Sequence, residues 1–523
     1  MKTLQNLGLV TLAAALMSCG WLEITGLAML GGFVPLLVLA SRYDSSARSW
    51  RRMLGWTVLF ITLWYGLTVW WVWNATPAGP IAATILGWIL SGLPFMGWFY
   101  VSKRAPKALS YTILVTAWTV GEWIYNTYQL SFPWLAVGNG FAHGPWAVQW
   151  YEWTGAYGGT IWVLVTSILI YECLIVRRPR RWLPPVLAAT IPLIVSLTLH
   201  ITYQAPLRTA KVTVVQPNID PYGEKFDLPQ SEQTANLAEL AKEAPTDARF
   251  IVMPETAIWS EQIIEGDMAS SPSLTTLRQT VAANSPQATL VVGATTYRLY
   301  GATKATATAG GDAERGYYDH YNSAIAISPE GTIDLHHKAK LVAGAEMLPT
   351  WFWVRWIQKL LARYDFYSGQ YGVGIERTVF KNDDIYAGAG ICWESVFGEY
   401  FSEFARNGAE VLFIITNDGW WRNTPGHRQH FDLARLRAVE TRRAIARSAN
   451  TGRSGFITPR GEVRQTLGWD VRGVITDELP LERRLTLYTR LGDWPCRISL
   501  LVLGLSTLYF IAWRIRRKDN IVP

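Results

Sequence analysis

The chain has 523 residues, half of them hydrophobic, and a formal net charge of +8. Long charge-free runs fill the first 203 residues and return only near the end. This distribution excludes a wholly soluble chain and indicates a membrane protein that carries one soluble domain. We attribute much of the basic excess to membrane topology and expect no nucleic-acid partner.

Eight stretches are apolar enough to cross a membrane as helices. We therefore predict a polytopic α-helical membrane bundle with seven spans before and one span after a soluble domain. The predicted domains are residues 1–203 (spans 1–7), 204–490 (the soluble domain) and 491–523 (span 8 and a basic tail). The spans cover roughly residues 5–20, 22–41, 53–73, 81–101, 110–128, 158–176, 183–203 and 497–515.

Basic residues occupy every second connection between these spans, and the connections around 20–23, 74–80 and 129–158 contain none. Because basic connections stay in the cytoplasm, both termini are expected there and the soluble domain is expected outside. A lipoprotein signal ending at Cys19 is the alternative for the first span, but its removal would break this alternation. The basic residues concerned are Lys2, Arg42, Arg48, Arg51, Arg52, Lys103, Arg104, Lys107, Arg177, Arg178, Arg180, Arg181, Arg514, Arg516, Arg517 and Lys518.

Two features of the membrane part are candidates for a function. The uncharged outer connection is rich in aromatic residues, among them Trp134, and either anchors at the lipid interface or lines a lateral opening for a lipid. Glu122 lies within the preceding span, where a carboxylate is a functional candidate. A hydrogen bond that packs two helices would explain Glu122 equally well.

From Lys211 onward, short β-branched runs alternate with helical segments. This alternation predicts a layered α/β domain with functional groups at the ends of strands. The expected strands are 212–215, 250–253, 289–293, 323–327, 385–391 and 411–416, and the expected helices are 231–243, 274–284, 396–406 and 427–449.

Cys392 is the only cysteine of the soluble domain, since Cys19 and Cys173 lie in spans and Cys496 lies at the edge of the last one. An exported domain with one thiol is not a disulfide scaffold. Cys392 follows a small-residue strand and precedes a predicted helix, whose N-terminus would favour the thiolate. The alternative is a buried small hydrophobic residue.

Two further strand ends carry the partners that acyl transfer through a cysteine requires. Glu255 could take the thiol proton, and Lys338 could stabilise an oxyanion together with the backbone N–H next to Cys392. Taken singly, a Pro-Glu after a strand is usually a surface turn and a lysine beside histidines is usually solvated. Their joint occurrence favours catalysis.

Further motifs accompany these three residues along the chain: Glu122-Trp123, Phe132-Pro133-Trp134, Gln216-Pro217-Asn218, Pro254-Glu255-Thr256, Lys338 with Leu341-Val342 and Glu346, Cys392 with Glu394, Asn417-Asp418 with Trp420, and Arg435, Arg437, Ala438, Glu440 and Arg443. In these motifs the chain resembles the apolipoprotein N-acyltransferases of the nitrilase (carbon–nitrogen hydrolase) superfamily along nearly its whole length. It departs from that family at Ala343-Gly344-Ala345, where the family usually has Pro-Phe-Gly, at Trp393, where the family often has tyrosine, and near Phe226, where the family has a tryptophan.

The resemblance implies a nitrilase-like αββα sandwich on the periplasmic side of the bacterial inner membrane, with Glu255, Lys338 and Cys392 as its catalytic triad. It further implies that Cys392 takes an acyl group from a phospholipid, typically phosphatidylethanolamine, as a thioester and passes it to the diacylglyceryl-cysteine of an apolipoprotein. Glu346, Glu394 and Trp393 would support the triad. We expect a monomer without a cofactor, and no metal, because the histidines lack metal-ligand spacing.

Aromatic residues alternate with cations between Glu346 and Gly374, including Trp351, Trp353 and Trp356. This composition is typical of an interfacial arm, and we expect these tryptophans, with Phe226, Trp134 and Glu122, to contact lipid. The alternative is that they pack on the domain core. Two rival functions stay open: a membrane-tethered nitrilase or amidase that uses water, and a non-enzymatic lipid-binding protein.

Overall fold

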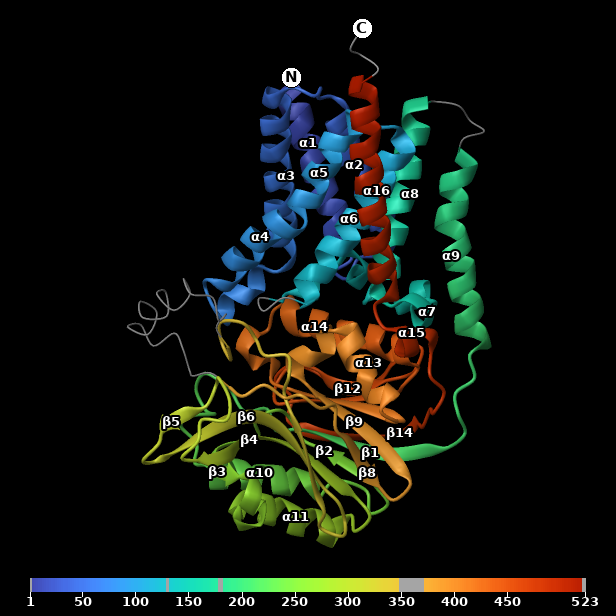
Figure 1. Cartoon of the computed structure of the whole chain (residues 1–523). Coiled ribbons are helices and arrows are strands. Elements are labelled where there is room, and N and C mark those ends of the chain that lie inside the picture. Colours follow the sequence, from blue (N-terminus) through green and yellow to red (C-terminus); the bar gives the residue numbers. More distant parts are fainter. Residues whose placement is uncertain (1, 128–130, 177–181, 348–370, 520–523) are drawn as a thin grey trace. The chain divides into compact units, whose positions relative to one another are not determined.

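The structure, a computed structural model, describes residues 2–127, 131–176, 182–347 and 371–519. The chain divides into two compact units (Figure 1). Met1–Thr202 and Leu491–Pro523 form the first unit, and Tyr203–Arg490 forms the second. The two units are described separately below.

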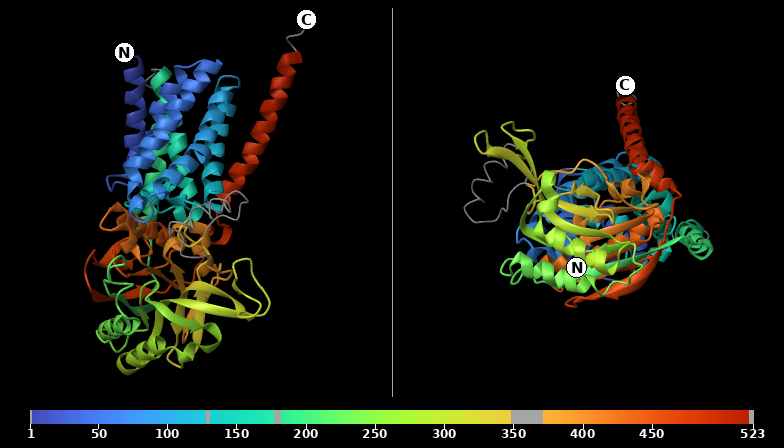
Figure 2. Two further views of the ribbon diagram at one scale, coloured as in Figure 1. Left: turned by 90° about the vertical axis from the view of Figure 1, so that its left-hand side faces the viewer. Right: turned by 90° about the horizontal axis from the view of Figure 1, so that it is seen from below.

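The first unit is a set of helices that run side by side (Figure 2). α9 contacts α8 and lies at the edge of this bundle. The helices are α1 (Lys2–Ser18), α2 (Val34–Ser41), α3 (Ala47–Thr68), α4 (Gly79–Leu90), α5 (Gly92–Ser102), α6 (Lys107–Thr127), α7 (Tyr151–Thr154), α8 (Ala156–Val176), α9 (Leu183–Thr202) and α16 (Trp494–Asp519).

Within the described residues, four helical stretches are long and apolar enough to cross a membrane: Gly79–Ser102, Ala156–Ile175, Leu183–Thr202 and Trp494–Arg516. Helical segments lie at all eight expected positions, but the count of eight spans stays a prediction. The second expected span is not one continuous helix, because a 3-10 helix at Gly26–Gly31 precedes the short α2. Two consecutive glycines, Gly31 and Gly32, lie at this break and weaken helix propagation.

The second unit contains two sheets with helices on their outer faces. Its helices are α10 (Gln230–Ala241), α11 (Pro272–Asn284), α13 (Gly398–Arg406), α14 (Pro425–Thr441) and α15 (Leu487–Leu491). Its strands are β1 (Thr209–Gln216), β2 (Phe250–Val252), β3 (Ile258–Ile264), β4 (Thr289–Gly301), β5 (Gly310–Asp312), β6 (Gly316–Ile327), β7 (Ile333–His337), β8 (Val379–Asn382), β9 (Ile385–Ile391), β10 (Val411–Thr416), β11 (Ile445–Ala449), β12 (Ser454–Ile457), β13 (Val463–Leu467) and β14 (Gly473–Pro480).

The strand order brings several functional strand ends to one edge of each sheet. The first sheet has the order β14-β1-β2-β4-β6-β5, with β3 paired to β4 and β7 to β6, and the second has the order β13-β12-β11-β10-β9-β8. β1, β2 and β4 are mutually parallel, as are β9, β10 and β11. Loops that follow parallel neighbours leave the sheet on the same side, which gathers their side chains.

The sheets pack face to face around an apolar core in which Phe250 of β2 lies edge-on to Phe413 of β10, with ring centroids 5.1 Å apart. α10 and α11 cover the outer face of the first sheet, where Leu237 and Leu277 pack on Ile251. α13 and α14 cover the outer face of the second sheet (Figure 1). The second unit therefore has four layers, helix, sheet, sheet and helix.

Two predicted helices differ from the structure. The helix expected over 427–449 ends at Thr441, because Arg442 adopts a left-handed conformation with φ of 53°, and Ile445–Ala449 form β11 beside β10. The prediction of helix for this last segment was wrong. The helix expected over 396–406 begins at Gly398, since Cys392–Val396 form a separate 3-10 helix.

Candidate active site

Cys392 is the first residue after β9, and its backbone has a φ of 50°. The small residues of β9 allow α13 to lie close to the strand: a Cβ on Gly390 would come within 2.5 Å of the Phe401 ring, and one on Gly388 within 2.7 Å of Phe404. Cys392 is 8% exposed and borders the core between the two sheets. The strand and helix therefore hold Cys392 in a nearly buried position.

The expectation that a helix start favours the thiolate was wrong for this site. Burial is the main influence on Cys392 and raises the pKa of its thiol, and the nearby Glu255 carboxylate raises it further. Lys338 acts in the opposite direction but does not outweigh them. One turn of 3-10 helix is too short to reverse this balance, so the surroundings of Cys392 favour the thiol over the thiolate.

Glu255 lies just after β2, on a turn packed so closely against Gly293 that a Cβ there would lie 2.5 Å from the Pro254 carbonyl oxygen. Its Oε1 accepts hydrogen bonds from Lys338 Nζ at 2.9 Å and from Asn322 Nδ2 at 2.7 Å. Its Oε2 accepts one from the backbone N–H of Asn417 at 3.0 Å. These donors hold the carboxylate in one orientation.

Lys338 follows β7 and is 1% exposed. Besides Glu255, its ammonium donates to Glu346 Oε1 at 2.8 Å. Burial disfavours the charged form, but Glu255 and Glu346 outweigh burial and raise the pKa of Lys338 well above its usual value. Because Cys392 also contributes to this rise, the cation and the sulfur are electrostatically coupled. The surroundings of Lys338 therefore favour its charged form.

Glu346 orients Lys338 through a compact loop. Its Oε2 accepts the backbone N–H of Val342 at 2.8 Å, and its Oε1 also receives Asn322 Nδ2 at 3.1 Å. Asn322, on β6, thus donates to both carboxylates that hold the lysine. Sequence reasoning missed Asn322, because a lone asparagine inside a strand pattern carries no signal.

Glu394 is fully buried and connects the lysine loop to the cysteine loop. It accepts the backbone N–H of Ala339 at 2.7 Å and that of Ile391 at 2.8 Å, together with His336 Nε2 at 3.1 Å and the Tyr400 hydroxyl. Burial alone would raise the pKa of Glu394, but His336 and these donors lower it. The neighbouring Trp393 is buried, with its ring 6.2 Å from that of Phe397.

A second buried hydrogen-bond network contacts the backbone of Cys392. His430 Nε2 lies 3.2 Å from the Cys392 carbonyl oxygen, and its Nδ1 lies 3.0 Å from Asp418 Oδ1. Asp418 Oδ2 accepts Arg447 Nη2 at 2.7 Å, and Thr416 donates to Asp418 Oδ1 at 2.9 Å. The Asn417-Asp418 pair was part of the sequence motif, whereas the roles of His430 and Arg447 were missed. Among the described residues, no group of three metal-ligating side chains could hold a metal ion.

The residues expected to contact lipid have different positions. Phe226 is 55% exposed, with its ring 4.9 Å from that of Trp259 and 6.3 Å from that of Trp420. Trp134 is fully buried, 5.0 Å from the Trp71 ring, and would contact lipid only if it were uncovered. The predictions for Trp351, Trp353 and Trp356 lie outside the described residues.

Glu122 is buried in the first unit. It accepts hydrogen bonds from Trp118 Nε1 at 2.8 Å, from the Val137 backbone N–H at 2.9 Å and from the Thr160 hydroxyl at 2.7 Å. These bonds attach α6 to the following connection and to α8, as expected for the packing alternative.

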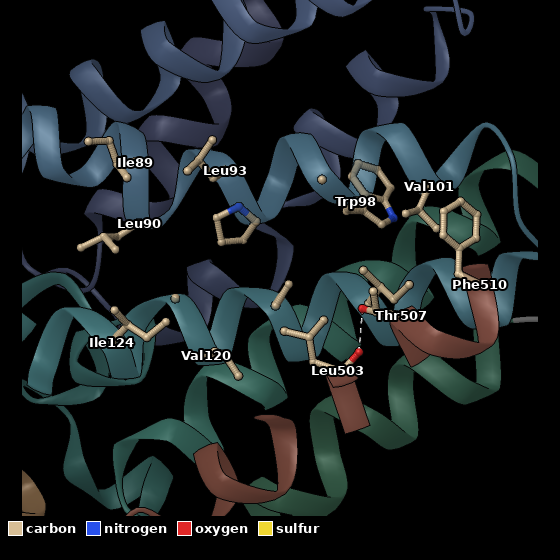
Figure 3. Close-up of a pocket in the computed structure, with 15 residues that line it drawn as sticks. Ile89, Leu90, Leu93, Trp98, Val101, Val120, Ile124, Leu503, Thr507 and Phe510 are labelled. Atoms are coloured by element: carbon tan, nitrogen blue, oxygen red, sulfur yellow. Dashed lines mark hydrogen bonds between the residues drawn. The ribbon is translucent and has the colours of Figure 1, made fainter. Parts of the chain in front are cut away.

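The first unit also has an apolar groove of about 460 Å³ between α4, α5, α6 and α16 (Figure 3). Leu93, Trp98, Val120 and Phe510 are among its lining side chains. The lining contains no acid, base or thiol, so the groove has no chemistry of its own.

Comparisons with known proteins agree with this geometry. Residues 211–486 match the family model of carbon-nitrogen hydrolases, and residues 8–169 match that of the apolipoprotein N-acyltransferase N-terminal domain. The chain is 30% identical to the apolipoprotein N-acyltransferase of Chlorobaculum tepidum over 498 residues, which cover 91% of this chain and 90% of that protein. It is 25% identical to the apolipoprotein N-acyltransferase of Thermotoga maritima over 446 residues, covering 84% and 79%.

Among solved structures, Saccharomyces cerevisiae Nit3, a member of branch 10 of the nitrilase superfamily, aligns with a TM-score of 0.39 and 20% identity over 56% of this chain and 97% of that chain. The two family matches and the relative from Chlorobaculum tepidum together cover both units of the chain. The chain therefore belongs to the apolipoprotein N-acyltransferase family, whose members are acyltransferases that N-acylate lipoproteins.

Proposed function

We propose that this chain transfers an acyl group from a membrane phospholipid, typically phosphatidylethanolamine, to the free α-amine of an apolipoprotein's diacylglyceryl-cysteine. Cys392 is the nucleophile, Glu255 the general base and Lys338 the oxyanion donor. The observation that carries this assignment is the Lys338 ammonium, which lies 2.9 Å from Glu255 and is electrostatically coupled to Cys392. A fixed, buried cation stabilises negative charge that develops close to it.

In the first half-reaction, Glu255 takes the thiol proton while the Cys392 sulfur attacks the ester carbonyl carbon. The carbonyl oxygen becomes an oxyanion, which Lys338 and the backbone N–H of Trp393 stabilise. When the ester C–O bond breaks, the proton on Glu255 passes to the lysophospholipid oxygen. An acyl thioester remains on Cys392.

In the second half-reaction, the neutral α-amine of the acceptor attacks the thioester carbonyl carbon. Glu255 accepts a proton from the nitrogen, and Lys338 stabilises the oxyanion again. The C–S bond then breaks, the proton returns to the departing sulfur, and an amide is released. Glu346 and Glu394 keep the lysine and the cysteine loop in place through both steps.

The enzyme would work in the bacterial inner membrane as a monomer with eight spans. We assign residues 1–203 and 491–523 to the membrane and 204–490 to a periplasmic catalytic domain, with both termini in the cytoplasm. The alternation of basic and uncharged connections supports this orientation. The exposed ring of Phe226 and the tryptophans Trp351, Trp353 and Trp356 are proposed to contact the lipid.

The test compares transfer with hydrolysis. Purified protein in micelles is supplied with phosphatidylethanolamine and a diacylated N-terminal cysteine lipopeptide, and products are separated by mass spectrometry. We expect triacylated peptide and lysophospholipid in equal amounts, with little free fatty acid. Free fatty acid as the main product would instead support the hydrolase alternative, and the absence of both products would support a non-enzymatic lipid-binding protein.

A further inference from the structure

A second lysine lies beside the catalytic base. Lys225 is 5% exposed, and its Nζ donates to the Thr256 hydroxyl at 2.5 Å. Within the part of the chain that the structure describes, this is the only hydrogen bond of its ammonium. An ammonium has three N–H donors, and leaving buried donors unpaired is costly. Two donors of Lys225 are therefore available to a partner.

Glu255 is not that partner, although it is close enough to influence Lys225. Burial lowers the pKa of Lys225 to about 8, and Glu255 opposes this effect. At neutral pH the side chain thus keeps its charge. The two Glu255 oxygens already receive Lys338, Asn322 and the Asn417 N–H, and Lys225 reaches only Thr256, the next residue along the chain.

The segment around Lys225 is held on the loops that carry the active site. The Tyr222 hydroxyl donates a hydrogen bond to the Trp420 carbonyl oxygen at 2.7 Å. Pro221 packs so closely on Gly419 that a Cβ added to this glycine would lie 2.6 Å from Pro221 Cγ. Phe226, the residue after Lys225, has an exposed ring that lies against the rings of Trp259 and Trp420. The segment thus combines a buried cation with an exposed aromatic surface.

This combination fits an amphiphile with an anionic group. Aromatic rings contact the glycerol and acyl portions of a lipid, and an ammonium binds phosphate as a point charge. A neutral acyl ester could accept a hydrogen bond from Lys225 but would leave its positive charge uncompensated. The oxygens of a phosphodiester would accept hydrogen bonds from both spare donors and supply the matching negative charge.

We propose that Lys225 binds a phosphodiester oxygen of the acyl donor while the aromatic surface of Tyr222, Phe226, Trp259 and Trp420 contacts the rest of the lipid. This inference rests on the proposed function. It makes Lys225 a substrate-binding residue that selects phosphate-bearing donors over neutral esters. Its position next to Thr256 places the donor beside Glu255.

The experiment measures the rate of Cys392 acylation from two donors, phosphatidylethanolamine and the p-nitrophenyl ester of the same fatty acid, which has no phosphate. It compares the wild-type protein with Lys225→Met, Lys225→Arg and the control Lys242→Met, whose exposed side chain pairs only with Glu239 among the described residues. In Lys225→Met, we expect acylation from phosphatidylethanolamine to fall by about tenfold or more, as for loss of a charged hydrogen bond.

The rate at which the aryl ester acylates Lys225→Met should stay within about twofold of the wild-type rate. Lys225→Arg should recover part of the rate with phosphatidylethanolamine because arginine keeps the charge. Lys242→Met should behave as wild type with both donors. An equal loss with both donors would overturn the inference and leave Lys225 as a residue that positions the Glu255 turn. Unchanged rates with both donors would overturn it as well.

Two further results separate the inference from the proposed function. If wild-type protein is acylated by neither donor, the proposed function itself fails. If Lys225→Met does not fold, wild-type protein still provides a test: it should take acyl groups from phosphatidylethanolamine faster than from diacylglycerol, and equal rates would contradict phosphate recognition.

Discussion

The buried carboxylate of Glu394 accepts the backbone N–H of Ala339 at 2.7 Å, and Ala339 is the residue that follows Lys338. The same side chain accepts the N–H of Ile391, the residue that precedes Cys392. One side chain therefore links the backbone next to Lys338, the proposed oxyanion donor, to the backbone next to Cys392, the proposed nucleophile. Neither bond involves a reacting atom, which makes Glu394 a positioning residue.

Replacing Glu394 with Gln should weaken both the fold and the chemistry. The amide would turn an N–H₂ group toward donors that need an acceptor, at a cost of roughly 2–4 kcal/mol of unfolding free energy. We expect a lower melting temperature and Cys392 acylation slowed by at least about tenfold. Glu314→Gln, at an exposed position, is the control and should match wild type. If Cys392 of Glu394→Gln were acylated as fast as that of the wild-type protein, this result would contradict the positioning role.

Gly390→Ala tests the close approach of α13 to β9. The added Cβ would meet the Phe401 ring at 2.5 Å and force the ring or the helix to shift, which typically costs about 1–3 kcal/mol. We expect a melting temperature several degrees below that of wild type. Gly468→Ala, where no heavy atom lies within 4 Å of the new Cβ, is the matched control. Equal melting temperatures for the two variants would show that the strand and helix are not tightly packed.

Glu255→Gln should remove the proposed general base without removing the thiol. Burial, the main cause that raises the pKa of Cys392, remains in this variant, so few thiolates form unless a base takes the proton. Loss of a general base typically costs about 10²–10⁴ in rate. We expect acylation to fall by that factor in folded protein, whereas Glu243→Gln on the exposed side of the domain should leave it unchanged. A rate within threefold of wild type would assign the base to another residue.

His427 should make the second unit sensitive to mild acid. Burial lowers the pKa of His427 to about 4, whereas an unfolded histidine titrates near 6.5. Between these values the unfolded chain binds more protons than the folded one, so the unfolding free energy falls as the pH drops from 6.5 toward 4, by at most about 3 kcal/mol.

The melting temperature of His427→Gln should therefore decrease less between pH 7 and pH 5 than the melting temperature of the wild-type protein does. Carboxylates that titrate in both proteins cancel in this comparison. The same loss in both proteins would show that His427 does not cause the acid sensitivity.

Six strands of the second unit, β1, β2, β4, β6, β9 and β10, could be predicted because turn residues bound them, whereas others such as β3 and β12 were not predicted. β9 and β10 have the predicted limits, since runs of small or β-branched residues end at Cys392 and Asn417. β11 could not be predicted: Ile445–Ala449 continue a helix-like pattern of arginines, and only the left-handed backbone of Arg442 ends α14.

Some residues of the candidate site could be predicted from the sequence, and others could not. Glu255, Lys338 and Cys392 stand next to strands in recognisable motifs, and the structure brings Glu255 and Lys338 to 2.9 Å. Asn322, His430 and Lys225 are single residues on other elements, whose approach to the site depends on tertiary packing. The prediction of eight spans rests on hydropathy and charge, which depend on composition more than on packing.

The central claim is that the Cys392 sulfur carries the acyl group. Intact-mass measurement of purified protein after incubation with phosphatidylethanolamine in micelles, followed by peptide mapping, tests it directly. We predict one added acyl chain on Cys392, lost on treatment with neutral hydroxylamine, which cleaves thioesters, and absent from Cys392→Ala. Folded wild-type protein without an adduct, or an adduct that persists in Cys392→Ala, would contradict the account.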